Sequence, residues 1–306
     1  MPSLRSRLLI FALKNRHLLN LRLKPEVIDW NTSTVQLREQ YEKAALRAGK
    51  VPAGIEVTPV SADGLTAEWI VTEGAPKDKV IFYTHGGGYV TGSCQDHRMH
   101  VAKFVQGSGV GAFLYDYRLA PEHPHPAAVE DSLTAYRWLL AQGVSPDHVV
   151  IVGESAGGGL CLALLLALRD SGLPLPAAGV ALSPWTDLKC TGGSYRTNAR
   201  ADISTLGSWI VWSKYYAGDN DPALPWISPL YGDLRGLPPI MIQVGDAEIL
   251  LDDAVRFANK AQAAGVDMTL RVWPGMVHCF PLLAPLFPEA TQAMQETCAY
   301  IRTHAG

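Results

Sequence analysis

The chain has 306 residues, of which 48% are hydrophobic and 18% charged, and its formal net charge is −3. This hydrophobic fraction suffices for a packed core and excludes a disordered chain. The slightly acidic balance argues against a nucleic-acid partner, which usually requires a basic face. The five cysteines are scattered and form no C-x-x-C pair, which is typical of a reducing compartment rather than of a disulfide framework.

The N-terminal segment is basic and apolar. The first 24 residues carry six basic side chains and no acidic one. Leu4, Leu8 and Phe11 fall on one stripe of a helix, and Leu9 and Leu13 lie beside it. We interpret the segment as a helix that packs on the main domain. Contact with a membrane surface is the alternative, because basic amphipathic helices can lie in a lipid interface.

Targeting signals are not evident in the sequence. No apolar run reaches the roughly 18–20 residues that a membrane span requires, so we expect no integral membrane segment. The apolar run near the N-terminus is shorter than the core of a signal peptide, and no small-residue cleavage site follows it. We therefore predict a cytoplasmic protein.

The next elements alternate between helix and strand. A second helix is predicted over residues 35–49, ending at Gly49. Asp63-Gly64 lies between two β-rich runs, at 55–61 and 65–72, and indicates a β-hairpin. Strand–helix alternation then predicts βαβ units and a mostly parallel sheet with helices on both faces. The predicted strands are 80–84, 112–115, 149–152, 179–182, 240–244 and 269–272, and the predicted helices include 127–142, 156–171, 250–264 and 289–304.

One stretch breaks the alternation. More than fifty residues, rich in Trp and Tyr, lie between Ser183 and Pro238. A structureless loop of this length is uncommon, so we predict an insertion of one or two helices over the carboxyl edge of the sheet. Its aromatic side chains form either core packing or a wall that faces the substrate. The predicted organisation is residues 1–50 as N-terminal helices contributing to a cap, and residues 51–306 as the catalytic domain with a cap insertion at about 186–235.

Residues 153–157 read Gly-Glu-Ser-Ala-Gly, which matches the pattern G-x-S-x-G. The pattern is weak alone, but here a predicted strand precedes it and a long apolar helix follows, which is the context of a nucleophile elbow. Gly153 and Gly157 let the backbone turn sharply and the helix approach the strand. Ser155 is therefore predicted to project above the edge of the sheet at a helix N-terminus, where the helix dipole favours negative charge.

Residues 85–89 read His-Gly-Gly-Gly-Tyr and follow a predicted strand. Successive glycines leave backbone N–H groups unshielded, and such donors stabilise the oxyanion that forms during acyl transfer. One arm of this oxyanion hole comes from the glycine loop, and the other from the residue after the nucleophile. Gly87, Gly88 and Ala156 are the predicted donors, and His85 is interpreted as a residue that organises the loop.

A general base is needed for Ser155, because a free hydroxyl is a poor nucleophile. In this fold the triad follows the chain order Ser, acid, His, so the base should come late. Two histidines remain. His304 falls in a terminal helical turn, whereas His278 follows the predicted strand 269–272, at the sheet edge where Ser155 also lies. We therefore predict His278 as the base.

The acid that orients His278 should follow the preceding strand. Two candidates, Asp246 and Glu248, lie in the loop after that strand. Two others, Asp252 and Asp253, fall inside the next helix and are interpreted as solvated or helix-start carboxylates. Spacing alone does not decide between the two loop residues.

Four stretches together resemble the hormone-sensitive-lipase-like (family IV) carboxylesterases of the α/β-hydrolase superfamily. They are His-Gly-Gly-Gly-Tyr at 85–89, Asp-Tyr-Arg-Leu-Ala-Pro-Glu-His at 116–123 with Pro-Ala-Ala at 126–128, Gly-Glu-Ser-Ala-Gly-Gly at 153–158, and Pro-Gly-Met-Val-His at 274–278. The resemblance covers roughly residues 50–300. It implies an α/β-hydrolase fold with a mostly parallel eight-stranded sheet, helices on both faces, a helical cap formed partly by the N-terminus, and no cofactor.

The resemblance also bears on the acid. In many members of this family the acid opens a D-P-L-x-D-[DE] stretch, which matches residues 248–253, so Glu248 stands where the family usually has Asp. Glu is longer but accepts the same N–H. The resemblance therefore implies Glu248 as the acid, with Asp246 as the alternative. Glu154 likewise stands where the family often has Asp before the nucleophile. The resemblance does not indicate what this exchange changes.

These features predict a serine carboxylesterase. It would hydrolyse small-molecule esters with short- to medium-chain acyl groups through an acyl-enzyme intermediate and a Ser155–Glu248–His278 triad. An amidase, a deacetylase or a lipase with the same triad is one alternative. A ligand-binding protein on the same scaffold is another, and the presence of His278 argues against it.

The last expectations concern the oligomeric state and metal binding. Members of this family often pair, so a homodimer is an expectation that the resemblance adds. Two histidine pairs suggest metal binding at first sight, His97 with His100 and His123 with His125. Neither pair has acidic or thiolate partners at a persuasive ligand spacing, so no metal site is expected.

Overall fold

The computed structural model describes residues 2–14, 28–48, 51–73, 75, 77–199, 202 and 206–306. Its centre is one sheet in the strand order β1-β2-β4-β3-β5-β6-β7-β8. β2 is antiparallel to both β1 and β4, and the other neighbouring strands are parallel. The strands are β1 (Ile55–Ala62), β2 (Leu65–Thr72), β3 (Val80–Thr84), β4 (Gly111–Tyr115), β5 (Val149–Glu154), β6 (Ala178–Leu182), β7 (Ile240–Gly245) and β8 (Met268–Trp273).

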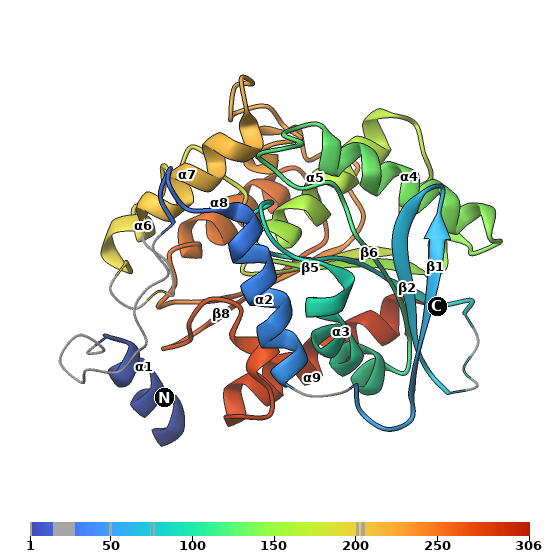
Figure 1. The fold of residues 1–306 in the computed structure, drawn as a ribbon, viewed down its shortest axis with the longest axis horizontal. Helices are drawn as coiled ribbons and strands as arrows, with labels where there is room; N and C mark the ends of the chain where they lie inside the picture. The colour runs from blue at the N-terminus through green and yellow to red at the C-terminus, as the bar shows by residue number, and fades with distance from the viewer. Residues whose placement is uncertain are drawn as a thin grey trace.

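Helices cover both faces of this sheet (Figure 1). α4, α5 and α8 pack on one face, and α3 and α9 pack on the other. The predicted mostly parallel eight-stranded sheet with helices on both faces is thus confirmed. The helices are α1 (Leu4–Lys14), α2 (Thr34–Ala48), α3 (Cys94–Ser108), α4 (Ala127–Ala141), α5 (Ala156–Asp170), α6 (Ser194–Thr197), α7 (Leu206–Ala217), α8 (Leu251–Ala263) and α9 (Pro288–His304), with short 3-10 turns η1 (Pro146–His148), η2 (Pro229–Tyr231) and η3 (Phe280–Leu283).

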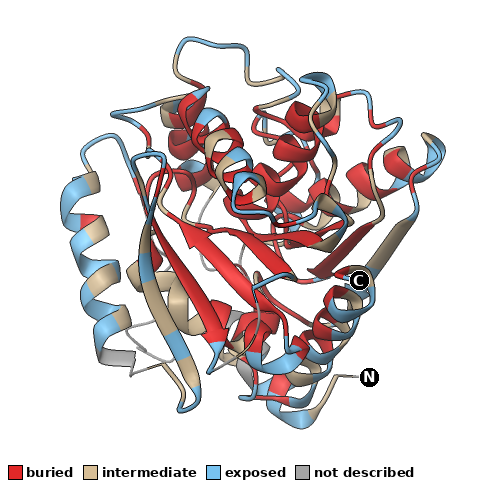
Figure 2. Cartoon of the chain, turned by 90° about the vertical axis from the view of Figure 1, so that its right-hand side faces the viewer, coloured by how far each residue is buried: buried red, intermediate tan, exposed pale blue. Residues whose placement is uncertain are grey.

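The central strands lie between two apolar cores, one for each face of the sheet. Every residue of β3, β5 and β6 is buried, and α5 is buried from Ala156 to Leu168. Figure 2 shows these strands in red between helices whose outer sides are exposed. A strand covered on both faces is hydrophobic throughout rather than alternating, which explains the short apolar runs in the sequence.

The predicted strands and helices are present in the structure, and their ends differ from the predicted ones by a few residues. α3 is the exception, because no predicted element covers it. Ser93 and Asp96 start this helix with a capping box, and Gly109 ends it in a left-handed conformation. The capping residues are visible in the sequence, but the first turns of α3 are polar, so its apolar periodicity is weak. The predicted helix end at Gly49 lies outside the described residues.

α1 contacts the main domain through its polar side. Glu289, in the first turn of α9, accepts hydrogen bonds from the backbone N–H and hydroxyl of Ser3 and from the hydroxyl of Ser6. Ser6 is fully buried there. A carboxylate is favourable at a helix N-terminus, so the two serines dock on a position that Glu289 already stabilises.

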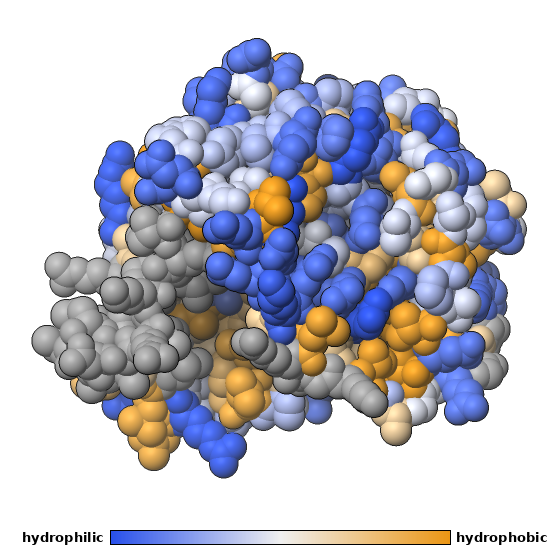
Figure 3. Space-filling model, in the orientation of Figure 1, coloured by the Kyte–Doolittle hydropathy of each residue, from blue (hydrophilic) through white to orange (hydrophobic). Residues whose placement is uncertain are grey.

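The described side chains of the apolar stripe of α1 are largely exposed beside this contact. Leu4 is 70% exposed, and Leu8 and Phe11 are each 59% exposed. In Figure 3 apolar atoms show at the lower left, where α1 lies. The side chains of Leu9 and Leu13 lie outside the described residues. No helix in the described part of the chain is long and apolar enough to cross a membrane.

The stretch between β6 and β7 contains α6, α7 and η2. It contacts the segment that leads into α2. The backbone N–H of Ile28 donates to the hydroxyl of Ser208 in α7 at 2.9 Å. The ring of Trp30 packs edge-on against that of Tyr215, with centroids 5.6 Å apart. The two segments that the sequence assigns to a cap therefore lie against one another.

The turn from β5 into α5 is closely packed. A Cβ at Gly157 would lie 2.1 Å from the backbone oxygen of Thr84 at the end of β3, and a Cβ at Gly159 would lie 2.2 Å from the backbone oxygen of Trp185. Real side chains do not tolerate such distances. The helix therefore sits against two neighbouring segments of backbone at positions where only glycine fits.

We expect Gly159→Ala to destabilise the fold, whereas Gly193→Ala should not. The new Cβ at position 159 would force α5 or the segment after β6 to move, and overpacking of this kind costs about 1–3 kcal/mol. Gly193 has helical φ and ψ, and a Cβ there would meet only the Asp252 carboxylate at 3.4 Å. Chemical denaturation of both variants measures the difference. Equal stabilities would contradict the close approach of α5.

Candidate active site

Ser155 occupies the turn between β5 and α5 in a strained conformation. Its φ of 56° and ψ of −123° lie in a region that residues with a Cβ rarely adopt. Its backbone N–H donates to the Leu182 carbonyl, and its own carbonyl accepts from the N–H of Trp185. These bonds hold the turn from both sides. The strain is therefore a property of the fold that presents this hydroxyl.

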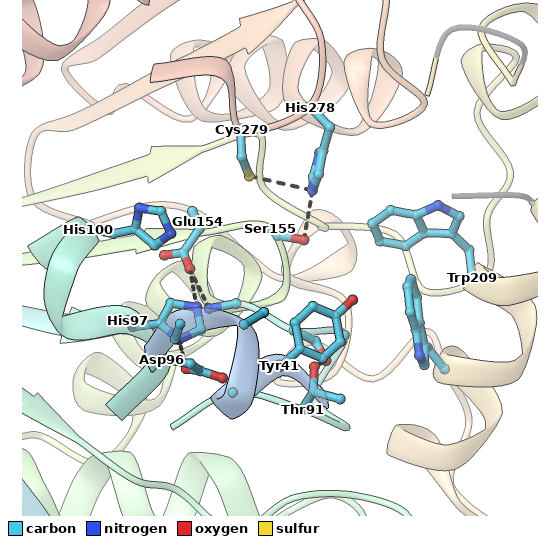
Figure 4. A pocket seen from close by; sticks show the side chains of 17 residues that line it. Tyr41, Thr91, Asp96, His97, His100, Glu154, Ser155, Trp209, His278 and Cys279 are labelled. Atoms are coloured by element: carbon cyan, nitrogen blue, oxygen red, sulfur yellow. Dashed lines mark hydrogen bonds and ion pairs between the residues drawn. The ribbon is translucent and has the colours of Figure 1, made fainter. Parts of the chain in front are cut away.

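A row of hydrogen bonds connects Ser155 to a buried carboxylate (Figure 4). Nε2 of His278 lies 3.0 Å from Oγ of Ser155. Nδ1 of the same ring lies 2.9 Å from Oε2 of Glu248. With the proton on Nδ1, the ring donates to the carboxylate and accepts from the hydroxyl, which is the arrangement in which a histidine can take the serine proton.

Glu248 is fully buried and held on its other oxygen. Oε1 accepts from the backbone N–H of Gly245 at 2.6 Å and from the hydroxyl of Ser183 at 2.8 Å. The side-chain amide of Asn198 donates to the Glu248 carbonyl at 2.9 Å. The carboxylate therefore has a single orientation, with Oε2 directed at His278.

The other three carboxylate candidates are engaged elsewhere. Asp246 is exposed and accepts from the N–H of Gly275 at 2.6 Å. Asp252 accepts from the N–H of Ser194 at 2.9 Å. Asp253 is fully buried in the first turn of α8 and accepts from two backbone N–H groups at the start of the stretch after β6, so it is a helix-start carboxylate and not a solvated one. Only Glu248 among the four reaches the His278 ring.

Burial and charge act against each other in this row. Burial disfavours the charged ring of His278, but the neighbouring Cys279 and the carboxylate of Glu248 outweigh it, and the pKa of His278 is raised above its ordinary value. The Cys279 sulfur lies 3.5 Å from Nε2 and can accept a hydrogen bond from the charged ring. Burial also raises the pKa of Glu248, and the hydrogen bond from His278 opposes that rise.

The glycine loop lies beside Ser155. Gly87 and Gly88 have φ values of 109° and 64°, which require glycine, and both line the same cavity as the serine hydroxyl. In the described part of the chain no acceptor takes a hydrogen bond from their N–H groups. Ala156, the third predicted donor, is the first residue of α5 and follows Ser155 directly. The arrangement suits an anion held by backbone amides at a helix N-terminus.

Neighbouring segments brace this loop. The Tyr117 hydroxyl donates to the His85 carbonyl at 2.8 Å, and the two rings stack at 4.1 Å. The His85 ring contacts the Gly86 carbonyl through Nδ1, at 2.9 Å. His85 thus lies under the loop and away from the Ser155–His278 row, in agreement with its interpretation as an organising residue.

Ser155 and His278 open into a cavity of about 420 Å³. The ring of Trp209 stands edge-on to that of His278 at 5.7 Å. Of the aromatic residues in the insertion, Trp209 and Trp212 line the cavity, whereas Trp185 lies in the core. The sequence left open whether these aromatic residues pack in the core or form a wall, and the structure shows that some do each.

The cavity has two unlike walls (Figure 4). The apolar wall comes from α2 and α7, and the polar wall from α3 and the residue before Ser155. The apolar wall consists of Tyr41, Ala44, Ala45, Trp209 and Trp212, and the polar wall of Asp96, His97, His100 and Glu154. No group of three or more His, Cys, Asp or Glu within the described ranges is arranged to hold a metal ion.

Two residues of the site, Ser183 and His97, have contacts that the sequence did not predict. Ser183 binds Glu248 and also accepts from the N–H of Cys279 at 3.0 Å, so it ties the acid to the histidine loop. Its position directly after β6, at the sheet edge, was the available signal. His97 was considered only as a metal ligand, and the structure instead puts it against Glu154.

The comparisons with known proteins agree with this geometry. Residues 81–282, which include Ser155 and His278, match a protein family described by its α/β-hydrolase fold. An acetyl-hydrolase of Streptomyces hygroscopicus is 41% identical over 286 residues, which is 91% of this chain and 94% of the relative. An esterase of Acinetobacter venetianus is 36% identical over 248 residues, which is 80% of this chain and 82% of the relative.

Solved structures resemble the chain over its whole length. An esterase from the bacterial hormone-sensitive lipase family has a TM-score of 0.89 at 41% identity, with 100% of both chains covered. The esterase EstE5, in a crystal soaked with p-nitrophenyl butyrate, has a TM-score of 0.88 at 40% identity, with 99% of both chains covered. The likeness therefore includes the N-terminal helices and the insertion as well as the sheet.

We expect Glu248→Ala to slow the reaction of Ser155 with a fluorophosphonate probe by roughly 10²–10⁴-fold, because His278 loses the group that fixes its tautomer and stabilises its charge. Asp246→Ala, the matched control in the same loop, should leave the rate nearly unchanged. Mass spectrometry of the labelled protein over time measures both rates. If the labelling rate instead collapsed in the Asp246 variant and stayed normal in the Glu248 variant, Asp246 would be the acid that orients His278.

The pH dependence of the same labelling reports on His278. The ring must be neutral to accept the serine proton, so the rate should rise with pH along a limb centred above the ordinary histidine value of about 6.5. Cys279→Ala removes one neighbour that favours the charged ring, so the limb should move to lower pH. Labelling rates between pH 5 and 9 test this, and an unmoved limb would exclude the sulfur as a cause.

Proposed function

Because this chain belongs to the α/β-hydrolase family and is a carboxylesterase of the hormone-sensitive-lipase group, we propose that it hydrolyses small esters with short- to medium-chain acyl groups. In this proposal Ser155 is the nucleophile, His278 the general base and Glu248 the acid that orients it. One observation carries the proposal: the hydrogen-bonded row from Glu248 to Ser155 ends in a cavity bordered by the glycine loop.

The first half of the reaction acylates the serine. Oγ of Ser155 attacks the carbonyl carbon of the ester while Nε2 of His278, 3.0 Å away, takes its proton. The carboxylate of Glu248 stabilises the charged ring that results. The tetrahedral intermediate then collapses: its bond to the alcohol oxygen breaks, and the departing alcohol takes the proton from Nε2.

The second half returns the enzyme to its starting state. Water attacks the acyl carbon and gives a proton to Nε2 of His278. The bond to Oγ breaks, Ser155 regains the proton, and the carboxylic acid leaves. Each half passes through an oxyanion, for which Gly87, Gly88 and Ala156 are the proposed donors. Loss of one such donor typically costs about 10²–10³ in rate.

The cavity supports a small substrate. Its volume of about 420 Å³ lies in the lower part of the range of about 300–1,000 Å³ that is typical of ligand pockets. Its apolar wall suits an acyl chain, and Trp209 and Trp212 close that wall. An acetyl-hydrolase among the relatives, and a butyrate ester soaked into EstE5, also favour short acyl groups.

The segments around the cavity are proposed to act as a cap. α2 contributes Tyr41 to the cavity and α7 contributes Trp209, and the segment that leads into α2 contacts α7 through Ile28 and Ser208. Substrate preference would then depend on both the N-terminal helices and the insertion at about 186–235. Cytoplasmic location and homodimer formation stay predictions.

Hydrolysis of p-nitrophenyl esters from acetate to palmitate tests the proposed function. We expect turnover of the short esters, a decline toward the long ones, and no turnover by Ser155→Ala. The matched amide, p-nitroacetanilide, should be hydrolysed far more slowly than p-nitrophenyl acetate. A preference for palmitate would make the protein a lipase, and faster cleavage of the amide would make it an amidase. Inactivity of folded wild-type protein on every substrate would refute the proposal.

A further inference from the structure

A second histidine–carboxylate cluster lies on the polar wall of the cavity. The ring of His97, on α3, stands between two carboxylates. Nδ1 contacts the Asp96 carboxylate, and Nε2 lies 3.0 Å from Oε1 of Glu154. All three side chains are at least mostly buried. Figure 4 shows the cluster on the opposite side of Ser155 from Trp209.

Glu154 links this cluster to the elbow and to the glycine loop. It is the residue directly before Ser155, and its Oε1 accepts from the backbone N–H of Gly86 at 2.7 Å. A Cβ at Gly86 would lie 2.9 Å from both the backbone oxygen and Oε1 of Glu154. The carboxylate therefore touches the loop immediately before Gly87, one of the proposed oxyanion donors.

The charge state of the cluster follows from its contacts. Burial alone would lower the pKa of His97, but the hydrogen bonds with Asp96 and Glu154 outweigh it and raise that pKa to about 10. Burial raises the pKa of Glu154, and the bonds with His97 more than reverse this. At neutral pH the cluster therefore holds a cationic ring between two anionic carboxylates.

The other groups that face His97 are neutral. The ring of His85 lies 5.1 Å away and that of His100 lies 6.1 Å away. Burial and the charge of His97 lower the pKa of His85, and the same causes lower that of His100 to about 4. His97 is thus the member of this histidine group that carries the charge.

A buried carboxylate beside an oxyanion hole is unfavourable without compensation. Negative charge develops on the substrate oxygen in the transition state, and a nearby anion opposes it most strongly where water is excluded. Glu154 is 3% exposed, so solvent does not screen it. The imidazolium of His97 is the cation in direct contact with it, at 3.0 Å from Oε1, and it shares its charge with Asp96 on the other ring nitrogen.

Resting on the proposed esterase function, we propose that His97 is a positioning residue of the oxyanion hole. As an imidazolium it compensates Glu154 and keeps that carboxylate bound to Gly86, which fixes the glycine loop against the elbow. His97 touches neither the nucleophile nor the base. Its contribution is to the transition state, so it belongs to kcat rather than to substrate binding.

Three variants separate this role from a merely structural one. His97→Gln should lower kcat on p-nitrophenyl acetate by about 10- to 100-fold with little change in KM, because the uncompensated carboxylate opposes the oxyanion. Glu154→Gln in the same chain removes that charge, so the double variant should regain much of the lost kcat. His123→Gln, the same exchange at an exposed histidine, is the control and should match wild type.

The outcomes discriminate sharply. Wild-type kcat in His97→Gln, or a further loss in the double variant, would overturn the compensation of Glu154 by His97. A change confined to KM would make His97 a substrate contact instead. Inactivity of the wild type toward esters is a different failure, that of the proposed function.

The protonation of His97 can also be measured without turnover. In ¹⁵N spectra of Ser155→Ala protein at pH 8, the His97 ring should carry protons on both nitrogens. Absence of this signal in His97→Gln or His97→Asn assigns it. A neutral His97 ring at pH 8 would overturn the proposal independently of the kinetic result.

Discussion

The backbone conformation of Ser155 is the constraint on which the site depends. A left-handed residue between a buried strand and a buried helix exists only where the surroundings enforce it. Here the enforcement is close packing, because Gly153 and Gly157 lie where a Cβ would come within 2.3 Å of neighbouring backbone. The turn therefore fixes the hydroxyl at the carboxyl edge of the sheet. His278 after β8 and Glu248 after β7 reach it because parallel strands end at that same edge.

The site contains two histidine–carboxylate pairs with opposite requirements. In the proposed reaction His278 gains and loses a proton in each half; its ring lines the cavity and binds one carboxylate, Glu248. His97 binds two carboxylates, and the hydrogen bonds with them raise its pKa to about 10 against the effect of burial. In the two proposals the same side chain is thus a proton carrier at one position and a fixed cation at the other.

Sequence reasoning predicted where Ser155, the glycine loop and His278 lie in the fold, because their placement follows from local backbone. The strand–turn–helix around Ser155, the glycine loop and the chain order that leads to His278 are all properties of short segments. Glu248 was not decided by spacing, because Asp246 lies in the same loop; in the structure Glu248 is distinguished by its contact with His278 and by the buried hydrogen bonds on its other oxygen. The partnership of His97 with Glu154 could not be predicted, because it joins α3 to β5 across the fold.

Several neighbouring segments hold the glycine loop on the sides that do not face the cavity. Tyr117 and His85 brace it from below, Glu154 binds its first glycine, and the indole of Trp212 lies where a Cβ at Gly88 would come within 2.8 Å. Trp212 belongs to α7, which also walls the cavity. The apolar wall of the cavity and the glycine loop, which carries two of the proposed oxyanion donors, are thus in direct contact. A substitution that moves the Trp212 indole would therefore act on the loop as well as on the shape of the cavity.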